Sequence, residues 1–361
     1  LQTLVFALVL SSFTVIYLVQ PVLPVIRQEF GVDEKQASYT VSAVIVGIAL
    51  ANLPFGRLAD RFPVKPLIAV GGAVLSLFGL LCALTHQLAL LIVFRFVQGL
   101  FIPAMTTCLV AYLARSLPVE RLNVVMGSYV AATVAGGLGG RLLGGWVHPP
   151  LDWRWAFVTV SVLIAAATLA ALLWLPRETR EAGAEARSDG FLALMARPDL
   201  LRIFAVAFSA FWIFSALFNY LPFYLSGPPF GASTEVITLT YLAYVTGIVV
   251  APASGRVSNH LGNGATIVIG ALVLGASLAL THAPRLWAVS AGLAGVCTGF
   301  FAVHAAAAGS MNRKLTASRG RANALYILFY YLGGSVGITV SGYGYQAFGW
   351  AGVTGIGLLL L

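Results

Sequence analysis

The sequence predicts an all-α polytopic membrane protein. Of its 361 residues, 59% are hydrophobic and only 9% are charged, and the mean hydropathy is +0.92. Soluble domains carry roughly 25% charged residues, so this composition excludes a water-soluble globular fold. The apolar stretches are continuous and lack the period-two alternation of a transmembrane β-barrel, so the membrane segments are predicted to be helices.

Twelve apolar runs predict the membrane helices in order, because about 20 apolar residues in a helix span the hydrocarbon core of a bilayer. The runs cover 4–26, 36–56, 67–85, 88–114, 122–147, 154–175, 200–225, 235–254, 265–281, 286–311, 322–346 and 349–361. The last run is short for a full crossing, so we expect its helix to be truncated at Leu361.

The chain is predicted to contain two bundles of six helices, at 1–175 and 200–361. Charged residues, alanine and glycine fill 176–199, which we expect to be a cytoplasmic linker. The charged loop Gly56–Lys65 (GRLADRFPVK) has a counterpart about 200 residues later at Gly255–Gly262. This repeat indicates that the two bundles are pseudo-symmetric.

Positive charges predict the orientation of the chain in the membrane. The 21 lysines and arginines outnumber the 12 acidic residues, and most of them lie in the loops that follow even-numbered runs. The positive-inside rule places those loops and both termini in the cytoplasm of a bacterial-type inner membrane. The basic residues are scattered over short loops, so we expect a monomer in the lipid bilayer without a nucleic-acid partner.

Residue patterns typical of enzymes are missing from the sequence. We find no pairing of nucleophile and base, no metal-ligand spacing and no phosphate-binding loop, so we expect no enzymatic activity, no cofactor and no metal site. A channel is disfavoured because the two halves offer no ring of repeated pore ligands. A transporter of a small molecule is the class that fits.

Three motifs make the chain resemble the major facilitator superfamily (MFS) over its whole length. The family's charged loop matches at Gly56, Leu58, Ala59, Asp60, Arg61 and Lys65, but Pro63 and Val64 depart from it. The fourth run contains R-x-x-Q-G as Arg95, Gln98 and Gly99. The fifth run resembles the antiporter pattern at Gly127, Gly136, Gly140, Gly144 and Gly145, with Arg141 replacing a proline. Residues 19–24 and 325–334 resemble the YnfM-like branch of drug:proton antiporters.

The resemblance implies the MFS fold and a secondary active transporter. Such a protein moves a small organic solute by rocker-switch alternating access, and the YnfM-like branch implies proton-coupled export, or efflux, driven by the proton gradient. The alternative is a uniporter or exchanger of an anionic or polar neutral metabolite without proton coupling.

The charged loop is expected to act as a gating motif, formed by Gly56, Asp60, Arg61 and Lys65. In the family this carboxylate, here Asp60, faces the N-terminus of the eleventh helix, whose partial positive charge attracts an anion. The alternative is a solvated Asp60 that pairs with Arg61 or Arg115.

The glycines of the fifth run are expected to allow close contact between helices, since small residues let backbones approach. The resemblance implies contact with the eighth helix across the domain interface. The alternative is tight packing within one half of the chain.

Arg95 and Arg141 fall inside predicted membrane helices, where an unpaired arginine costs about 2.5 to 3.5 kcal/mol. We expect both to face a wet cavity or a partner. The alternative for Arg95 is a structural hydrogen bond to the backbone or near Gln98. All 12 acidic residues lie near the predicted membrane surfaces, so a site with these arginines favours an anionic or polar neutral solute over a cation.

His304, in the middle of the tenth run, is the candidate proton carrier, because histidine titrates near neutral pH. The alternative is a neutral, hydrogen-bonded histidine. Polar and aromatic residues complete the candidate substrate site, although each of them would also fit as core filling or as an interfacial anchor. They are Tyr17, Gln20, Gln98, Asn219, Tyr220, Tyr244, Tyr326 and Tyr330.

Overall fold

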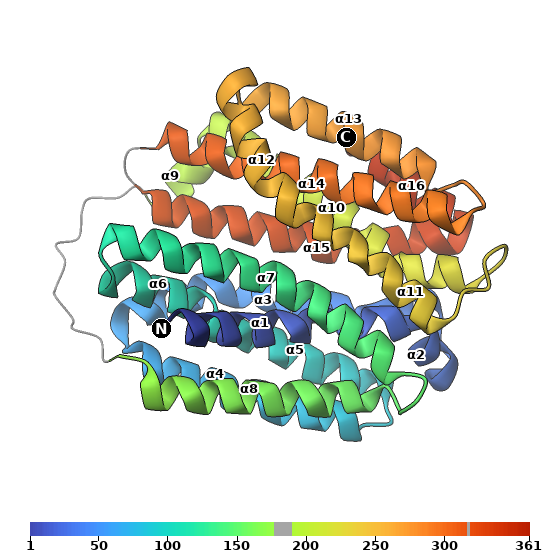
Figure 1. Ribbon diagram of the computed structural model, residues 1–361, viewed down its shortest axis with the longest axis horizontal. Helices are drawn as coiled ribbons and strands as arrows, with labels where there is room; N and C mark the ends of the chain where they lie inside the picture. Colours follow the sequence, from blue (N-terminus) through green and yellow to red (C-terminus); the bar gives the residue numbers. More distant parts are fainter. Residues whose placement is uncertain (177–189, 316–317) are drawn as a thin grey trace. The chain divides into compact units, whose positions relative to one another are not determined.

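The computed structural model describes residues 1–176, 190–315 and 318–361, and within these ranges it contains helices and no strand (Figure 1). The all-α prediction is therefore confirmed. Most of the predicted linker, 176–199, lies outside the described residues. The chain divides into two compact units. Unit 1 takes in Leu1–Val32 and the chain from Tyr39 through α8, and unit 2 takes in Asp33–Ser38 and the chain from α9 onward.

Unit 1 is built from helices that correspond to the first six predicted runs, except that the first residues of the helix in the second run, up to Ser38, belong to unit 2. In chain order they are α1 (Gln2–Tyr17), η1 (Gln20–Val22), α2 (Leu23–Phe30), α3 (Glu34–Arg61), α4 (Val64–Leu84), α5 (Leu88–Met105), α6 (Thr107–Ser116), α7 (Val119–Val147) and α8 (Arg154–Trp174). The first run is interrupted because Pro21 and Pro24 have no N–H to donate to the carbonyl groups of Tyr17 and Gln20, four residues earlier. The first predicted span is therefore two helices joined by a short 3₁₀ turn.

Unit 2 repeats this construction with the later runs. Its helices are α9 (Phe191–Met195), α10 (Pro198–Ser226), α11 (Thr234–Thr240), η2 (Tyr241–Tyr244), α12 (Val245–Leu261), α13 (Asn263–Leu280), α14 (Leu286–Lys314), α15 (Arg319–Phe348) and α16 (Trp350–Leu359). The eighth predicted run is also interrupted, here by the 3₁₀ segment η2.

Ten segments among the described residues are long and apolar enough to cross a membrane. The helix α7, of 29 residues, and the short helix α16, of 10 residues, occupy the places of the fifth and twelfth predicted runs. The structure is consistent with the twelve predicted helices.

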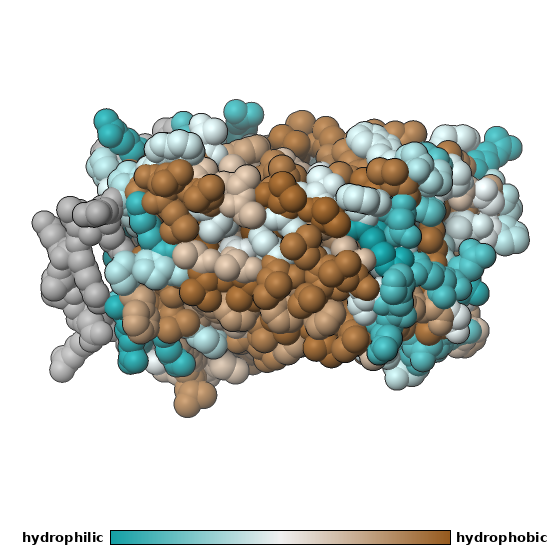
Figure 2. Space-filling model, turned by 90° about the horizontal axis from the view of Figure 1, so that it is seen from below, coloured by the Kyte–Doolittle hydropathy of each residue, from teal (hydrophilic) through white to brown (hydrophobic). Residues whose placement is uncertain are grey.

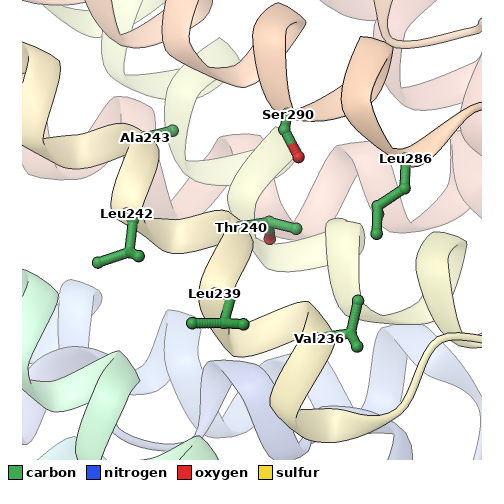
Figure 3. Close-up of a pocket in the computed structure, with 7 residues that line it drawn as sticks. All are labelled: Val236, Leu239, Thr240, Leu242, Ala243, Leu286 and Ser290. Carbon is green, nitrogen blue, oxygen red and sulfur yellow. The ribbon is translucent and has the colours of Figure 1, made fainter.

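The outward surfaces of the units are apolar, as lipid contact requires. The face drawn in Figure 2 is hydrophobic through its middle, with hydrophilic residues gathered toward its two ends. On unit 1, helices α4 and α8 expose Leu77, Leu84, Leu169 and Leu173. On unit 2, a pocket between α11–η2 and the start of α14 is lined by apolar and small polar side chains, and its Leu239 and Leu242 are exposed (Figure 3).

Glycines hold the first and fifth membrane segments of unit 1 together. A methyl group on Gly136 would overlap the carbonyl oxygen of Leu10, and methyl groups on Gly140 and Gly144 would overlap the carbonyl oxygens of Thr14 and Leu18. Helices α1 and α7 therefore contact each other backbone to backbone (Figure 1). This is the within-half packing named above as an alternative. Contact of the glycines with the eighth helix stays a prediction. Of the two remaining glycines of the pattern, Gly145 is buried, and the burial of Gly127 lies outside what the structure describes.

Unit 2 uses glycines in the equivalent place. Gly333 lies against the backbone of Phe208, and Gly337 lies against that of Trp212, so α15 packs closely on α10. The seventh and eleventh segments thus repeat the contact of the first and fifth. This correspondence supports the internal repeat inferred from the charged loops.

We expect Gly140→Ala to destabilise the folded protein by about 1 to 3 kcal/mol, because the new methyl group would overlap the Thr14 carbonyl oxygen and force α7 away from α1. The measurement is the melting temperature of the detergent-purified protein. Gly139→Ala is the matched control, since its methyl group would lie 3.9 Å from the Thr14 hydroxyl oxygen, an ordinary contact. Equal melting temperatures for the two variants would contradict the close contact of α1 and α7.

Candidate functional site

Arg95, on α5, is fully buried at 0% exposure and donates four hydrogen bonds within unit 1. Its Nη1 donates to the carbonyl oxygen of Val15 (2.7 Å) and to Oε1 of Gln98 (3.0 Å). Its Nη2 donates to the carbonyl oxygen of Ile16 (2.8 Å), and its Nε donates to that of Thr40 (3.0 Å). These bonds join α5 to the end of α1 and to α3.

The Val15 and Ile16 carbonyls belong to the last turn of α1, where helix carbonyl groups lack intrahelical donors. The positive guanidinium of Arg95 lies at the negative end of the helix dipole and caps it. Gln98 completes the group by donating from Nε2 to the Leu75 carbonyl oxygen (3.3 Å). This geometry corresponds to the structural alternative for Arg95, and a role of Arg95 or Gln98 in substrate binding stays a prediction.

Arg141, on α7, lies against Tyr17 and Gln20 in the same unit. Its Nε donates to Oε1 of Gln20 (2.8 Å), and its Nη1 donates to the Gly137 carbonyl oxygen (2.7 Å). The Tyr17 ring covers the guanidinium at 3.9 Å from its centroid, a favourable cation–π distance. Arg141 is 1% exposed and Gln20 is 0% exposed. The structure thus brings together three residues that the sequence named separately.

The predicted charged loop is mostly helical, since its residues up to Arg61 form the end of α3 and Lys65 lies in the first turn of α4. This segment is anchored within unit 1. Arg115, on α6, lies 3.5 Å from the carboxylate of Asp60 and donates to the Ala59 carbonyl oxygen at 3.0 Å. Lys65 donates to the Leu172 carbonyl oxygen (2.9 Å) near the end of α8, where a positive charge is favourable. Arg61 is exposed, and the Asp60 side chain is 75% exposed. The Arg115 pairing is one of the two alternatives named above, and the gating role of the loop stays a prediction.

His304, on α14, lies among aromatic side chains of unit 2. The Tyr326 hydroxyl oxygen is 3.0 Å from Nδ1 of His304 and 3.2 Å from its carbonyl oxygen. Phe300 stacks on the imidazole with centroids 5.9 Å apart, and the Tyr330 ring lies 5.1 Å away. The structure therefore brings three predicted residues together, His304, Tyr326 and Tyr330.

The remaining candidates of unit 2 are buried by contacts of its own core. Tyr220 donates from its hydroxyl to the Ile338 carbonyl oxygen (2.9 Å), and Tyr244 packs edge-on against Phe214 with centroids 5.2 Å apart. Asn219 is 0% exposed and donates from Nδ2 to the hydroxyl of Ser38 (2.7 Å). These positions fit the core-filling alternative, and their contact with a substrate stays a prediction.

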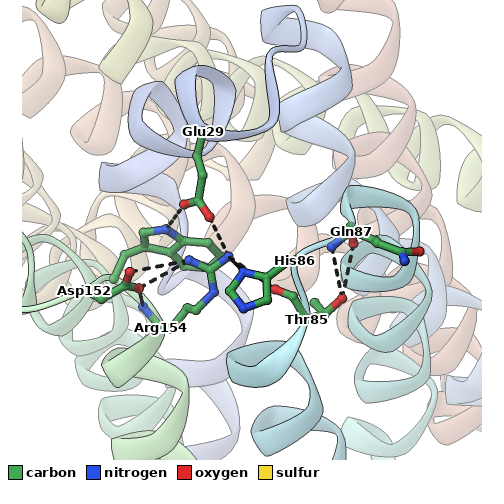
Figure 4. Close-up of polar contacts among 7 residues, drawn as sticks. Glu29, Thr85, His86, Gln87, Asp152 and Arg154 are labelled. Atoms are coloured by element: carbon green, nitrogen blue, oxygen red, sulfur yellow. Dashed lines mark hydrogen bonds and ion pairs between the residues drawn. The ribbon is translucent and has the colours of Figure 1, made fainter.

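A charged cluster at one end of unit 1 was missed by the sequence reasoning (Figure 4). Arg154, at the start of α8, donates from Nη2 to Oε1 of Glu29 (2.6 Å) and to the Thr85 carbonyl oxygen (3.2 Å), and its Nη1 lies 3.4 Å from Asp152. The His86 ring is 3.4 Å from the same guanidinium. The sequence signal that could have indicated this cluster was the placement of Glu29, Asp152 and Arg154 on one predicted side of the membrane.

Among the described residues, no group of histidine, cysteine and acidic side chains is arranged to hold a metal ion.

Comparisons with known proteins agree with the motifs. A family model described as Major Facilitator Superfamily matches residues 5–278 and 229–361. The chain is 28% identical over 356 residues to the inner membrane transport protein YnfM of Escherichia coli (strain K12), covering 98% of this chain and 85% of that protein. It is 33% identical over 167 residues to a multidrug resistance protein B homolog of Mycobacterium tuberculosis (strain H37Rv), covering 46% of this chain and 31% of that protein.

The fold is similar to that of a solved D-xylose-proton symporter. The TM-score is 0.80 at 15% sequence identity, and the match covers 99% of this chain and 95% of the symporter. The likeness supports the helical architecture described above.

We expect Arg95→Gln to lower the free energy of unfolding by about 3 kcal/mol or more, because at least two buried carbonyl groups lose a charged donor, each worth about 1.5 to 3 kcal/mol. Thermal unfolding in detergent measures this loss. Arg95→Lys should be intermediate, since an ammonium group keeps the charge but not the planar fork of donors. A melting temperature equal to that of the unmodified protein would contradict the capping role.

We expect Arg154→Ala to destabilise unit 1 by about 2 kcal/mol, because Glu29 and the Thr85 carbonyl group lose a charged hydrogen-bond donor. Melting curves at low and high salt are the measurement. Glu29→Gln should cost less, since the amide oxygen still accepts from Arg154, although the amide nitrogen cannot accept the hydrogen bond that Trp153 donates from Nε1. If both variants have the same melting temperature as the unmodified protein, the cluster contributes nothing to stability.

Proposed function

This chain belongs to the Major Facilitator Superfamily, and on that premise we propose that it is a secondary active transporter that exports a small organic solute in exchange for protons. The family is one of membrane transporters, and the chain is a multi-pass integral membrane protein with apolar helices in both units. The observation that carries the proposal is the duplicated construction, in which each unit has its own glycine-packed pair of helices, α1 with α7 and α10 with α15.

The two predicted bundles, 1–175 and 200–361, are the bodies that would move in alternating access, with 176–199 connecting them. Close backbone contact within each unit supports movement of a unit as one body. The distribution of lysine and arginine supports a cytoplasmic position for both termini, and the likeness to YnfM supports the inner membrane as the location. The partial likeness to a multidrug resistance protein homolog supports export.

His304 is the residue that we propose to carry the proton. Tyr326 has one hydroxyl proton, so it donates either to Nδ1 or to the carbonyl oxygen of His304. When it donates to the carbonyl oxygen, Nδ1–H of the ring donates to Tyr326, and Nε2 is left with a lone pair that can accept a proton. Proton uptake at Nε2 would then place a charge beside Tyr330, whose ring face attracts cations.

A second candidate function is a uniporter or exchanger of an anionic or polar neutral metabolite. The pairing of Arg141 with Gln20 favours it, since buried donors suit a solute that accepts hydrogen bonds. In this case transport would not depend on a proton gradient.

We expect proteoliposomes to transport a solute, selected by its effect on melting temperature, at least about tenfold faster with an imposed pH gradient than without one, and His304→Gln to lose that acceleration. Counterflow of labelled solute is the control, because exchange without a gradient should survive in the variant. Transport that is indifferent to the gradient in the unmodified protein would favour the uniporter or exchanger.

A further inference from the structure

We propose that Arg141 and Gln20 form a binding site for the carboxylate of the transported solute, an inference that rests on the proposed transport function. The site lies within unit 1, where η1 meets α7. It would select singly charged organic anions over neutral or cationic solutes of the same shape.

The orientation of the Gln20 amide follows from the chemistry of its neighbour. A guanidinium group only donates hydrogen bonds, so the amide oxygen of Gln20 must face Arg141. The amide nitrogen Nε2 is then directed away from that bond. Gln20 is 0% exposed, and Nε2 has no acceptor among the described residues. A buried donor without an acceptor costs about 1 to 3 kcal/mol, so its retention needs a reason.

The pair formed by Arg95 and Gln98 shows what a purely structural arrangement looks like in the same unit. There too a buried arginine donates to the oxygen of a buried glutamine, over 3.0 Å. However, Nε2 of Gln98 donates to the Leu75 carbonyl oxygen, so that amide has a partner at each end. Gln20 has the same arginine contact and lacks the second acceptor. The difference identifies Nε2 of Gln20 as the donor that is available to a ligand.

A carboxylate fits the donors that this site presents. One of its oxygens can accept a hydrogen bond from the Gln20 amide, and the positive charge of the neighbouring guanidinium favours an anion at this position. The Tyr17 ring lies 3.9 Å from the Arg141 guanidinium and packs on one of its faces, which restricts the orientation of the guanidinium. A primary amine is protonated at neutral pH, so it offers only hydrogen-bond donors, and it would add a positive charge beside Arg141.

The helix break described above places the donor. Gln20 is the first residue of the 3₁₀ turn η1, between α1 and α2. Gly144, on α7, packs against the Leu18 backbone and brings this turn close to the helix that carries Arg141. This backbone contact holds the turn beside α7.

The test uses the purified protein in lipid nanodiscs with matched probes. Acetate and benzoate are compared with acetamide and benzamide, and with ethylamine and benzylamine, by melting temperature and by equilibrium binding. We expect at least one carboxylate to bind and its amide and amine partners to bind at least about tenfold more weakly. Absence of any preference for the carboxylates would overturn the proposal, as would equal stabilisation by nitrate, which would indicate a site for inorganic anions.

Variants of Gln20 give the sharper result, because they leave Arg141 in place. Gln20→Glu puts a carboxylate against the guanidinium, so the protein should stay folded and lose affinity for the probe by about 30-fold or more. Gln20→Leu removes the free donor and should weaken binding by about tenfold. Gln2→Leu makes the same change at the other end of the first segment, where Gln2 contacts Ser128, and should leave binding unchanged.

Unchanged affinity in folded Gln20→Glu protein would overturn the assignment. The binding experiment and the transport experiment test the two proposals separately. Carboxylate binding without solute movement in proteoliposomes would refute the transport function alone, whereas transport of a cation with no effect of Gln20→Glu would refute the carboxylate site alone.

Discussion

The break in the first membrane segment is the constraint on which both buried arginines depend. Inside a bilayer, backbone carbonyl groups without a donor are costly because water is absent. Helix α1 ends at Tyr17, just before Pro21 and Pro24, and the carbonyl groups of Val15 and Ile16 in its last turn accept hydrogen bonds from Arg95. The same break turns Gln20 toward Arg141. One local feature of the chain therefore accounts for two intramembrane charges.

The two Arg–Gln pairs show why a charged residue within a membrane is ambiguous until its partners are known. Arg95 satisfies backbone acceptors on two other helices, and its amide neighbour is also satisfied. Arg141 donates to an amide whose nitrogen has no acceptor in the part of the chain that the structure describes. The two groups differ in the hydrogen bond of the glutamine Nε2 atom, which Gln98 makes and Gln20 does not make to any described residue. Only the folded structure shows this difference.

Much of the architecture could be predicted from the sequence, since long apolar runs and the repeated charged loop depend only on local composition and spacing. The interruption near Pro21 and Pro24 was not predicted, since the sequence analysis expected one run over 4–26, and Pro54, Pro222 and Pro252 lie inside continuous helices. The partners of Arg95 could not be predicted, since every residue has a backbone carbonyl group and the sequence does not indicate which of them accepts a hydrogen bond from a distant side chain. Gln20 and Arg141 are separated by 121 positions, and Glu29 and Arg154 by 125, so only folding shows that they meet. The glycines at 136, 140 and 144 predicted close contact correctly in kind, but their spacing could not identify α1 as the helix they touch.

The glycine contact between α1 and α7 also bears on the mechanics of unit 1. Where two helices meet through side chains, a change of rotamer can absorb a small displacement between them. Along the seam of Gly136, Gly140 and Gly144 the contacting atoms are largely main-chain carbonyl groups, which have no rotamers to change. A displacement of α7 would therefore move α1 with it. Arg141 and Gln20, which lie on opposite sides of that seam, would keep their spacing if unit 1 moved as one body.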